Sequence, residues 1–205
     1  MQLQIIPGED EAALSYLGAA EGGFTGVIDI GGGSTELIAG HDLDVDFGFS
    51  CQMGAVRLFR MLPIRSHEDT RAVIELADGL LREQLDRLGG ADIPNVWRGT
   101  GGTFTALAAL RHGVSWSERG CIHGTGLTRE FVQQMCTRLA DMTVEQRLAV
   151  PGLHPGRADI VVHGICILLA CMGRLGFDSI TVSEYGNLDG YMKRTYQLTG
   201  GLTNA

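Results

Sequence analysis

The sequence predicts an α/β fold in which a five-stranded mixed sheet is flanked by helices. Short β-branched runs alternate with longer segments whose apolar residues recur at helical spacing. Two of the expected strands run directly into glycine clusters, at 31–33 and at 99–102. Hydrophobic residues make up 44% of the 205-residue chain, which is enough to bury a core. These observations favour a compact α/β fold.

The first hundred residues are expected to open with a helix and an antiparallel meander. Residues 10–19 read as a short helix that ends near a glycine. The β-branched run 27–30 enters the glycine loop, 35–39 alternates again, and 44–50 supplies a third strand after a turn.

The later elements follow from apolar spacing and from capping signals, such as Ser66 before a long helix and the Thr143-x-x-Gln146 box. The elements expected are helices at 56–59 and 73–88, a strand at 95–98, helices at 106–110, 129–140 and 157–175, a strand at 179–182 and a last helix after 186. The order β-β-β-α-β-α-β-α is that of a ribonuclease-H-like lobe. No internal repeat or linker interrupts it.

Charge and composition narrow the functional class. A net charge of −8 disfavours nucleic acid as a partner, because binding its phosphates needs a basic face. The five cysteines form no C-x-x-C pair, so neither a disulfide framework nor a zinc site is indicated. No apolar run is long enough to span a membrane, and no signal peptide is visible at the start. We therefore expect a cytoplasmic protein without a membrane partner.

The first glycine loop carries the residue types of a phosphate and metal site. Asp29 ends a strand, Gly31, Gly32, Gly33 and Ser34 follow, and Glu36 lies two residues further. Residues without Cβ atoms let backbone amides converge on an anion. Because Asp29 and Glu36 can flank this site, a divalent cation such as Mg²⁺ is expected between them. The alternative is a plain glycine hairpin with solvated acids.

The second glycine loop lies between a strand and a helix. Gly101, Gly102 and Thr103 would place free amides at the start of that helix, where its dipole favours an anion. One such turn is weak evidence, and its alternative is an ordinary tight turn. Two loops, each directly after a hydrophobic strand, indicate one polyphosphate chain held at two points.

Further short blocks accompany the two loops along the chain. They are Gly8–Ala12, Ile28–Glu36, Met53–Leu58, Gly99–Leu107, Arg157–Asp159 and Val182–Gly190. Their residues and order resemble the exopolyphosphatase and guanosine pentaphosphate phosphatase family of the actin/hexokinase/heat-shock ATPase superfamily. The blocks span nearly the whole chain, so the resemblance implies an actin-like ATPase lobe.

The resemblance also implies roles for individual residues. Glu11 matches the proposed general base, and a carboxylate can deprotonate water for in-line attack on phosphorus. From spacing alone Glu11 is a helix-surface acid. Asp29 and Glu36 match the acidic pair at the metal, and the two glycine loops match phosphate loops. Gly186 and Gly190 match a segment where close helix packing lets two lobes hinge.

The resemblance further implies a two-lobed parent. Its first lobe carries a D-x-G-S-N-S phosphate loop, and this chain has no such sequence. We therefore expect residues 1–20 to be the last segment of the first lobe, with Glu11, and residues 21–205 to be the second lobe. The isolated chain should show little activity. Near the end, Leu188 stands where the family pattern has arginine, which puts any contact of that arginine in doubt.

The expected activity is hydrolysis of the terminal phosphoanhydride bond of inorganic polyphosphate, with Mg²⁺ or another divalent cation as cofactor. The alternative substrate is guanosine pentaphosphate (pppGpp), which the sequence does not separate from polyphosphate. A nucleotide-dependent kinase of the same superfamily would lack the Gly8–Ala12 block. A non-catalytic phosphate-binding fragment stays open, as does a homodimer.

Overall fold

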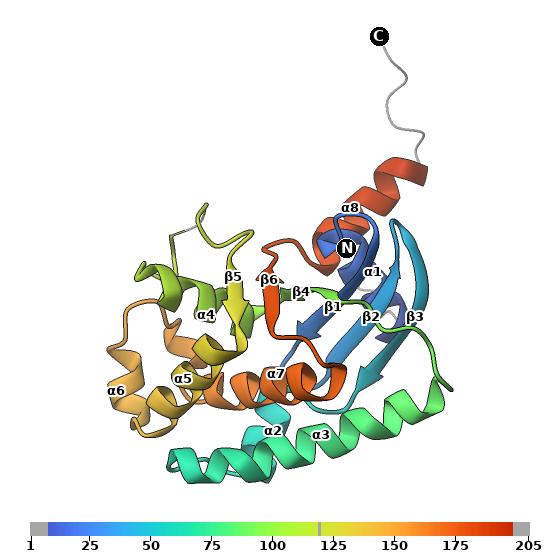
Figure 1. The fold of residues 1–205 in the computed structure, drawn as a ribbon. Helices are drawn as coiled ribbons and strands as arrows, with labels where there is room; N and C mark the ends of the chain where they lie inside the picture. Colours follow the sequence, from blue (N-terminus) through green and yellow to red (C-terminus); the bar gives the residue numbers. More distant parts are fainter. Residues whose placement is uncertain (1–7, 119, 199–205) are drawn as a thin grey trace, which may run out of the picture.

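The computed structural model describes residues 8–118 and 120–198 and contains a six-stranded mixed sheet (Figure 1). The strands are β1 (Phe24–Ile30), β2 (Thr35–His41), β3 (Asp44–Cys51), β4 (Val96–Thr100), β5 (Gly126–Thr128) and β6 (Ser179–Val182). Their order across the sheet is β3-β2-β1-β4-β6-β5. The β1–β4 and β4–β6 pairs are parallel, and the other three pairs are antiparallel. The predicted mixed sheet is therefore confirmed.

The predicted strand count was wrong by one. Strand β5 has three residues, of which only Leu127 is buried, and three residues are too few for a strand pattern to be recognised in the sequence. It forms by pairing antiparallel with β6 at the sheet edge. Its existence depends on a neighbour more than fifty residues away rather than on its own composition.

Helices cover both faces of the sheet. They are α1 (Gly8–Ala19), α2 (Ala55–Met61), α3 (Thr70–Arg87), α4 (Gly102–His112), α5 (Arg129–Ala140), α6 (Val144–Leu148), α7 (Val161–Leu175) and α8 (Asn187–Leu198), with 3₁₀ turns at His67–Asp69 and Pro155–Arg157. Helices α3 and α7 lie together on one side of the sheet, and α1 and α8 lie together on the other (Figure 1). Within the described ranges, no helix is long and apolar enough to cross a membrane.

Local signals place most of the helix starts. The Thr128 hydroxyl accepts the Phe131 amide at the start of α5, and Thr143 and Gln146 form the expected capping box of α6. The long apolar helix, however, begins at Val161 and not at 157. Residues 155–157 instead form a 3₁₀ turn whose cap is His154, since its side chain accepts the Gly156 amide.

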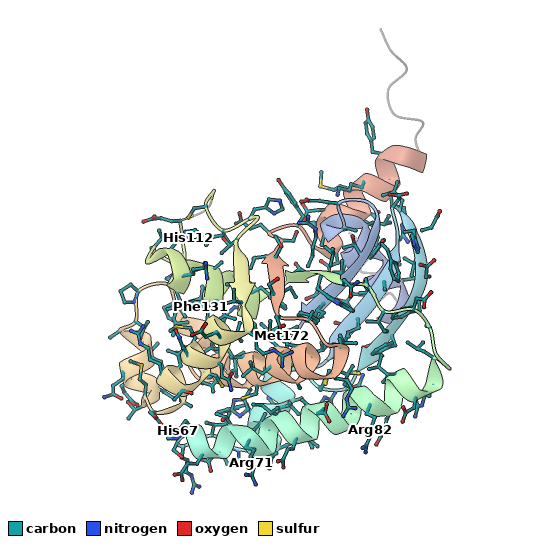
Figure 2. The ribbon with its side chains drawn as sticks, viewed as in Figure 1. His67, Arg71, Arg82, His112, Phe131 and Met172 are labelled. Atoms are coloured by element: carbon teal, nitrogen blue, oxygen red, sulfur yellow. The ribbon has the colours of Figure 1, made fainter. Side chains whose placement is uncertain are left out.

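The main core lies between the sheet and α3, α4, α5 and α7. Helix α7 is buried along most of its length, so it is the central helix of this layer. Helix α3 turns Val73, Ala77 and Leu81 toward the core, while Arg71 and Arg82 extend from its solvent side (Figure 2). This separation follows from helical periodicity and keeps charge out of the core.

The second layer depends on glycine contacts between α1 and α8. A Cβ on Gly190 would overlap the carbonyl oxygen of Leu14, and one on Gly18 would overlap that of Gly186. Backbone therefore touches backbone, which allows the two helices an unusually close approach. The close packing expected at Gly186 and Gly190 is thus present, and Lys193 Nζ adds hydrogen bonds to the last carbonyls of α1.

This contact predicts opposite effects for two helical glycines. Gly190→Ala should lower the free energy of unfolding by about 2–3 kcal/mol, because the added methyl group has no space against α1. Gly79→Ala, in α3, meets no atom within 4 Å and should raise it by about 0.5–1 kcal/mol. Urea unfolding of both variants measures the difference. Equal effects would show that the α1–α8 contact is looser than described.

Candidate active site

The site begins where the parallel strands β1 and β4 end side by side. Asp29 of β1 is in register with Thr100 of β4, so the glycine loop after each strand leaves the same edge of the sheet. The loops also touch, since a Cβ on Gly101 would lie 3.0 Å from both Asp29 Oδ1 and the Ile30 carbonyl oxygen. Gly101 has φ +96°, so glycine is required there on both counts.

The first loop is a β1–β2 hairpin whose carbonyls are held by the start of α2. The carbonyl of Gly31 accepts the Ala55 amide at 2.9 Å, and that of Gly32 accepts the Val56 amide at 2.9 Å. The carbonyl of Gly33 accepts the Gly54 amide at 3.2 Å. A side chain on Gly54 would overlap the Gly32 backbone, so this seat for the hairpin needs glycine.

This anchoring determines where the hairpin amides point. In a trans peptide the carbonyl and the following N–H are antiparallel. Because the carbonyls of Gly31, Gly32 and Gly33 face α2, the amides of Gly32, Gly33 and Ser34 point away from it. The amide of Gly31 is not available, because it donates to the Ser34 carbonyl at 3.0 Å. Among the described residues, none of these three amides donates a hydrogen bond, and three successive free amides make a cradle that suits an anion.

The second loop brings the start of α4 to the same place. Gly101 is the N-cap and offers no side-chain hydrogen bond, so the first amides of an eleven-residue helix lack a cap. The Thr103 side chain is buried and packs against Gly164 of α7, which leaves its backbone amide as its contribution to the site. The helix dipole adds positive potential at this end.

Both loops line one cavity of about 520 Å³, as the sequence predicted. The cavity is bounded by Asp29 to Gly32, by Gly101 to Thr103, and by the segment that runs from His154 into the start of α7. Gly33 and Ser34, which were also expected at the site, are not among the residues that line this cavity. Backbone amides from two directions therefore face a common space.

Arg157 is the functional candidate that residue patterns did not assign. Its guanidinium lies so close to Gly102 that a Cβ there would overlap it, and it lines the cavity. Among the described residues, no hydrogen bond or ion pair engages this guanidinium. An unpaired guanidinium beside free amides suits a phosphate group. The sequence signal was the Arg157–Asp159 block, but only the fold shows what the arginine faces.

Asp29 is the carboxylate of the cavity. Its pKa is raised from 3.8 to about 6, chiefly by burial; a hydrogen bond from Ser15 Oγ to Oδ2 at 2.9 Å opposes the rise, and the charges of Glu36 and Glu11 add to it. Glu36 stands directly opposite Asp29 in the β1–β2 ladder, so both side chains share one face of the sheet. Concentrated negative charge without a cationic partner favours a bound cation or a proton.

The two predicted metal ligands differ in access. Asp29 lines the cavity, whereas Glu36 is buried behind it and accepts a hydrogen bond from Ser50 Oγ at 2.7 Å. Over the part of the chain that the structure describes, no group of three His, Cys, Asp or Glu side chains could hold a metal ion. Two carboxylates are compatible with a divalent cation such as Mg²⁺, which takes one or two carboxylates and completes its shell with water and phosphate oxygens.

Glu11 reaches the site from α1. Ser15, four residues later on the same helix face, is the residue that bonds to Asp29, so Glu11 is directed to the same region. Asn187 Nδ2 of α8 donates to Glu11 Oε1 at 3.3 Å and orients it. Glu11 does not line the cavity itself. It stands beside Asp29 closely enough to raise the pKa of that carboxyl.

A second cavity of about 590 Å³ adjoins the first. The two share Gly101, Gly102, His154 and Arg157, so the arginine stands between them. Trp116 forms part of its wall with 48% of its surface exposed, and its ring meets His154 edge-on at 4.3 Å. Leu188, the departure from the family pattern, also lines this cavity. Its lining combines an aromatic ring with several carboxylates.

Comparison with known proteins identifies relatives of the whole chain. Residues 1–197 match the model of the Ppx/GppA phosphatase family. The chain is 36% identical over 199 residues to Exopolyphosphatase 2 of Mycobacterium tuberculosis, covering 91% of the chain and 62% of that protein. The chain thus spans about three fifths of the length of that relative.

Solved structures agree with this fold. The Aquifex aeolicus PPX-GPPA enzyme superposes with a TM-score of 0.82 at 26% identity, over 91% of this chain and 63% of the other. An exopolyphosphatase from Cytophaga hutchinsonii superposes with a TM-score of 0.79 at 26% identity, over 95% and 65%. The predicted actin-like, ribonuclease-H-like lobe is confirmed by these neighbours.

The raised pKa of Asp29 predicts a pH-dependent effect on stability. Between its ordinary value of 3.8 and about 6, the folded chain holds a proton that the unfolded chain has lost, so unfolding becomes easier as pH rises through this window. Asp29→Asn removes that penalty. It should raise the free energy of unfolding by about 1–2 kcal/mol at pH 7.5 and by less than about 0.5 kcal/mol at pH 4.

Urea unfolding at both pH values measures this difference. Asp92→Asn, on an exposed loop, is the matched control and should show no such dependence. A gain at Asp29 that is equal at both pH values would contradict the electrostatic account.

Proposed function

Since the chain belongs to the Ppx/GppA phosphatase family, we propose that it binds inorganic polyphosphate and hydrolyses the terminal phosphoanhydride bond as one lobe of a two-lobed enzyme. The observation that carries the proposal is the shared cavity, in which amides from two glycine loops and the Arg157 guanidinium converge. The name of the Mycobacterium tuberculosis relative supports polyphosphate as the substrate class.

The charge of the chain explains why binding must be local. With a net charge of −8, the surface as a whole repels a polyanion. Hydrogen-bond donors in the cavity offset this repulsion locally. They are the hairpin amides, the amides at the start of α4 and the Arg157 guanidinium. We propose that the end of the polyphosphate chain occupies this position, with its terminal phosphate at Gly32 and its neighbour toward Gly102.

A divalent cation would complete the site at Asp29. When bound, it would neutralise charge on the phosphate oxygens and on the carboxylates. Glu36 would add negative charge from behind, while its bond from Ser50 keeps it in place. The proton that Asp29 retains near pH 6 would compete with the cation. Cation binding should therefore weaken as pH falls below about 6.

Glu11 is the group that we propose to accept a proton from the attacking water. Its bond from Asn187 holds Oε1, and within the described ranges no hydrogen bond engages Oε2, which we propose to accept a water molecule. The water would attack phosphorus in line, the anhydride bond would break, and inorganic phosphate would leave. Ser15 lies on the same face of α1 as Glu11 and donates a hydrogen bond to Asp29 in β1. Helix α1 therefore carries one carboxylate and holds the other in place.

A second candidate substrate is pppGpp, and one observation favours it. The neighbouring cavity offers the half-exposed ring of Trp116, against which a base could stack, and the carboxylates of Glu118 and Glu184, which could accept its N–H groups. Trp116→Ala should then reduce phosphate release from pppGpp and leave release from polyphosphate unchanged. Equal loss with both substrates would remove the base-stacking role.

The experiment that tests the function is phosphate release from polyphosphate and from pppGpp, measured side by side with and without Mg²⁺. The 205-residue chain is assayed alone and within the two-lobed protein. We expect Mg²⁺-dependent release by the two-lobed protein and little by the chain alone. Binding of polyphosphate without release by either protein would favour a non-catalytic phosphate-binding role.

Glu11 predicts a loss confined to turnover. In the two-lobed protein, Glu11→Gln should lower kcat by about 10²–10⁴-fold, because a general base contributes that much, with the affinity for polyphosphate nearly unchanged. Asp10→Asn is the matched control, since this exposed acid precedes Glu11 on the same helix. Steady-state kinetics of both variants measure the difference. An unchanged kcat in the Glu11 variant would show that Glu11 is a surface acid with no part in the reaction.

A further inference from the structure

Arg57 is bonded to the hairpin from the side opposite its free amides. Its Nε donates to the Gly33 carbonyl at 2.8 Å, and its own backbone amide donates to the Gly32 carbonyl at 3.1 Å. Its Nη2 donates to Gln52 Oε1 at 2.8 Å, which fixes the plane of the guanidinium. One residue thus holds two successive peptides of the loop.

The side-chain bond determines the direction of one amide in particular. Among the described residues, the Gly33 carbonyl accepts two hydrogen bonds, one of 2.8 Å from Arg57 Nε and one of 3.2 Å from the Gly54 amide. The peptide that begins at Gly33 ends in the Ser34 N–H, which points the opposite way. A charged donor on the carbonyl also polarises that peptide and makes its N–H a better donor.

In the structure, Arg57 is directed away from the cavity between the two glycine loops. It lies with Arg60 and Met61 along a groove on the α2 side of the hairpin, and it is absent from the cavity wall. Any effect on the bound phosphate must therefore pass through the Gly33–Ser34 peptide or through long-range charge. These two routes differ in what they require of the side chain.

We propose that Arg57 is a positioning residue of the phosphate hairpin: its bond to the Gly33 carbonyl holds the hairpin against α2, so that the amides on the opposite side stay directed toward the cavity that Gly31 and Gly32 line. The proposal rests on the proposed function for the identity of the anion. It needs the Nε–H at its place in the side chain. Lysine keeps the charge but has a methylene at that place, so Arg57→Lys removes the bond and retains the attraction.

Arg60 supplies the matched control. It lies one turn further along α2 in the same groove, and no hydrogen bond or ion pair of its side chain occurs within the described ranges. Arg60→Gln removes a positive charge near the hairpin without removing a bond to it. Positioning predicts that Arg57→Lys is harmful and Arg60→Gln is not, whereas simple attraction predicts the reverse order.

The first measurement is calorimetric titration of the 205-residue chain with inorganic tripolyphosphate at about 0.15 M salt, where long-range charge effects are screened. Arg57→Lys should weaken binding by about 5- to 20-fold, as expected for one lost charge-assisted bond. Arg60→Gln should change it by less than about threefold. Gln52→Ala, which frees the guanidinium while leaving Arg57 intact, should fall between them.

The second measurement needs no ligand. The ¹⁵N–¹H resonance of Ser34 should move in Arg57→Lys and in Gln52→Ala and stay in place in Arg60→Gln. Unmoved Ser34 resonances in both of the first two variants, or equal tripolyphosphate affinities for Arg57→Lys and wild type, would overturn the proposal. Wild-type protein that fails to bind tripolyphosphate would count against the proposed function, while the resonance would still decide whether Arg57 positions the loop.

Discussion

The parallel pairing of β1 with β4 is the constraint on which the site depends. Two parallel strands end at the same edge, so the loops that follow them must begin side by side. Glycine then allows each loop to turn at once, and Gly101 lies directly against Asp29. An antiparallel arrangement of the same two strands would place the loops at opposite edges, and no single anion could meet both.

Helix α2 separates the donors of the first loop from its acceptors, because it binds the loop carbonyls on one side and leaves the amides on the other. Helix α2 has only seven residues, and its first amides are taken up by the hairpin carbonyls. The short helix therefore serves as a seat for the loop rather than as a site of its own. The carboxylates show the complementary feature, since Asp29, Glu36 and Glu11 lie close together and the pKa of Asp29 rises to about 6. The cavity wall thus combines backbone amides and the Arg157 guanidinium with the Asp29 carboxylate. Glu36 and Glu11 add negative charge close to Asp29.

Much of the fold was predictable from local signals in the sequence. The strand that ends at Ile30, the capping box of Thr143 and Gln146, and the two glycine loops all follow from chemistry within a few residues. The strand before the second loop was expected to end at residue 98, but β4 continues to Thr100. The short strand β5 was not predictable, because it forms only against β6. The 3₁₀ turn before α7 was also missed, since the apolar spacing around it resembles a longer helix.

The sequence predicted which types of residue form the candidate site, but not which side chains and amides face the cavity. The sequence placed Asp29 and Glu36 together, and the β1–β2 register explains why. It did not show that Glu36 is buried or that the Gly31 amide is already bonded. Arg157 depends on contacts between segments about fifty-five residues apart, which no spacing rule covers.

The glycine contact between α1 and α8 has a mechanical consequence for these side chains. Where the two main chains touch, sliding of one helix along the other would bring backbone atoms into collision, so we expect α1 and α8 to move together. Ser15 of α1 donates a hydrogen bond to Asp29, and Asn187 of α8 donates one to Glu11. A tilt of α8 would therefore displace both acids together, so the two helices near the ends of the described chain control the positions of acids at the sheet edge that carries the glycine loops.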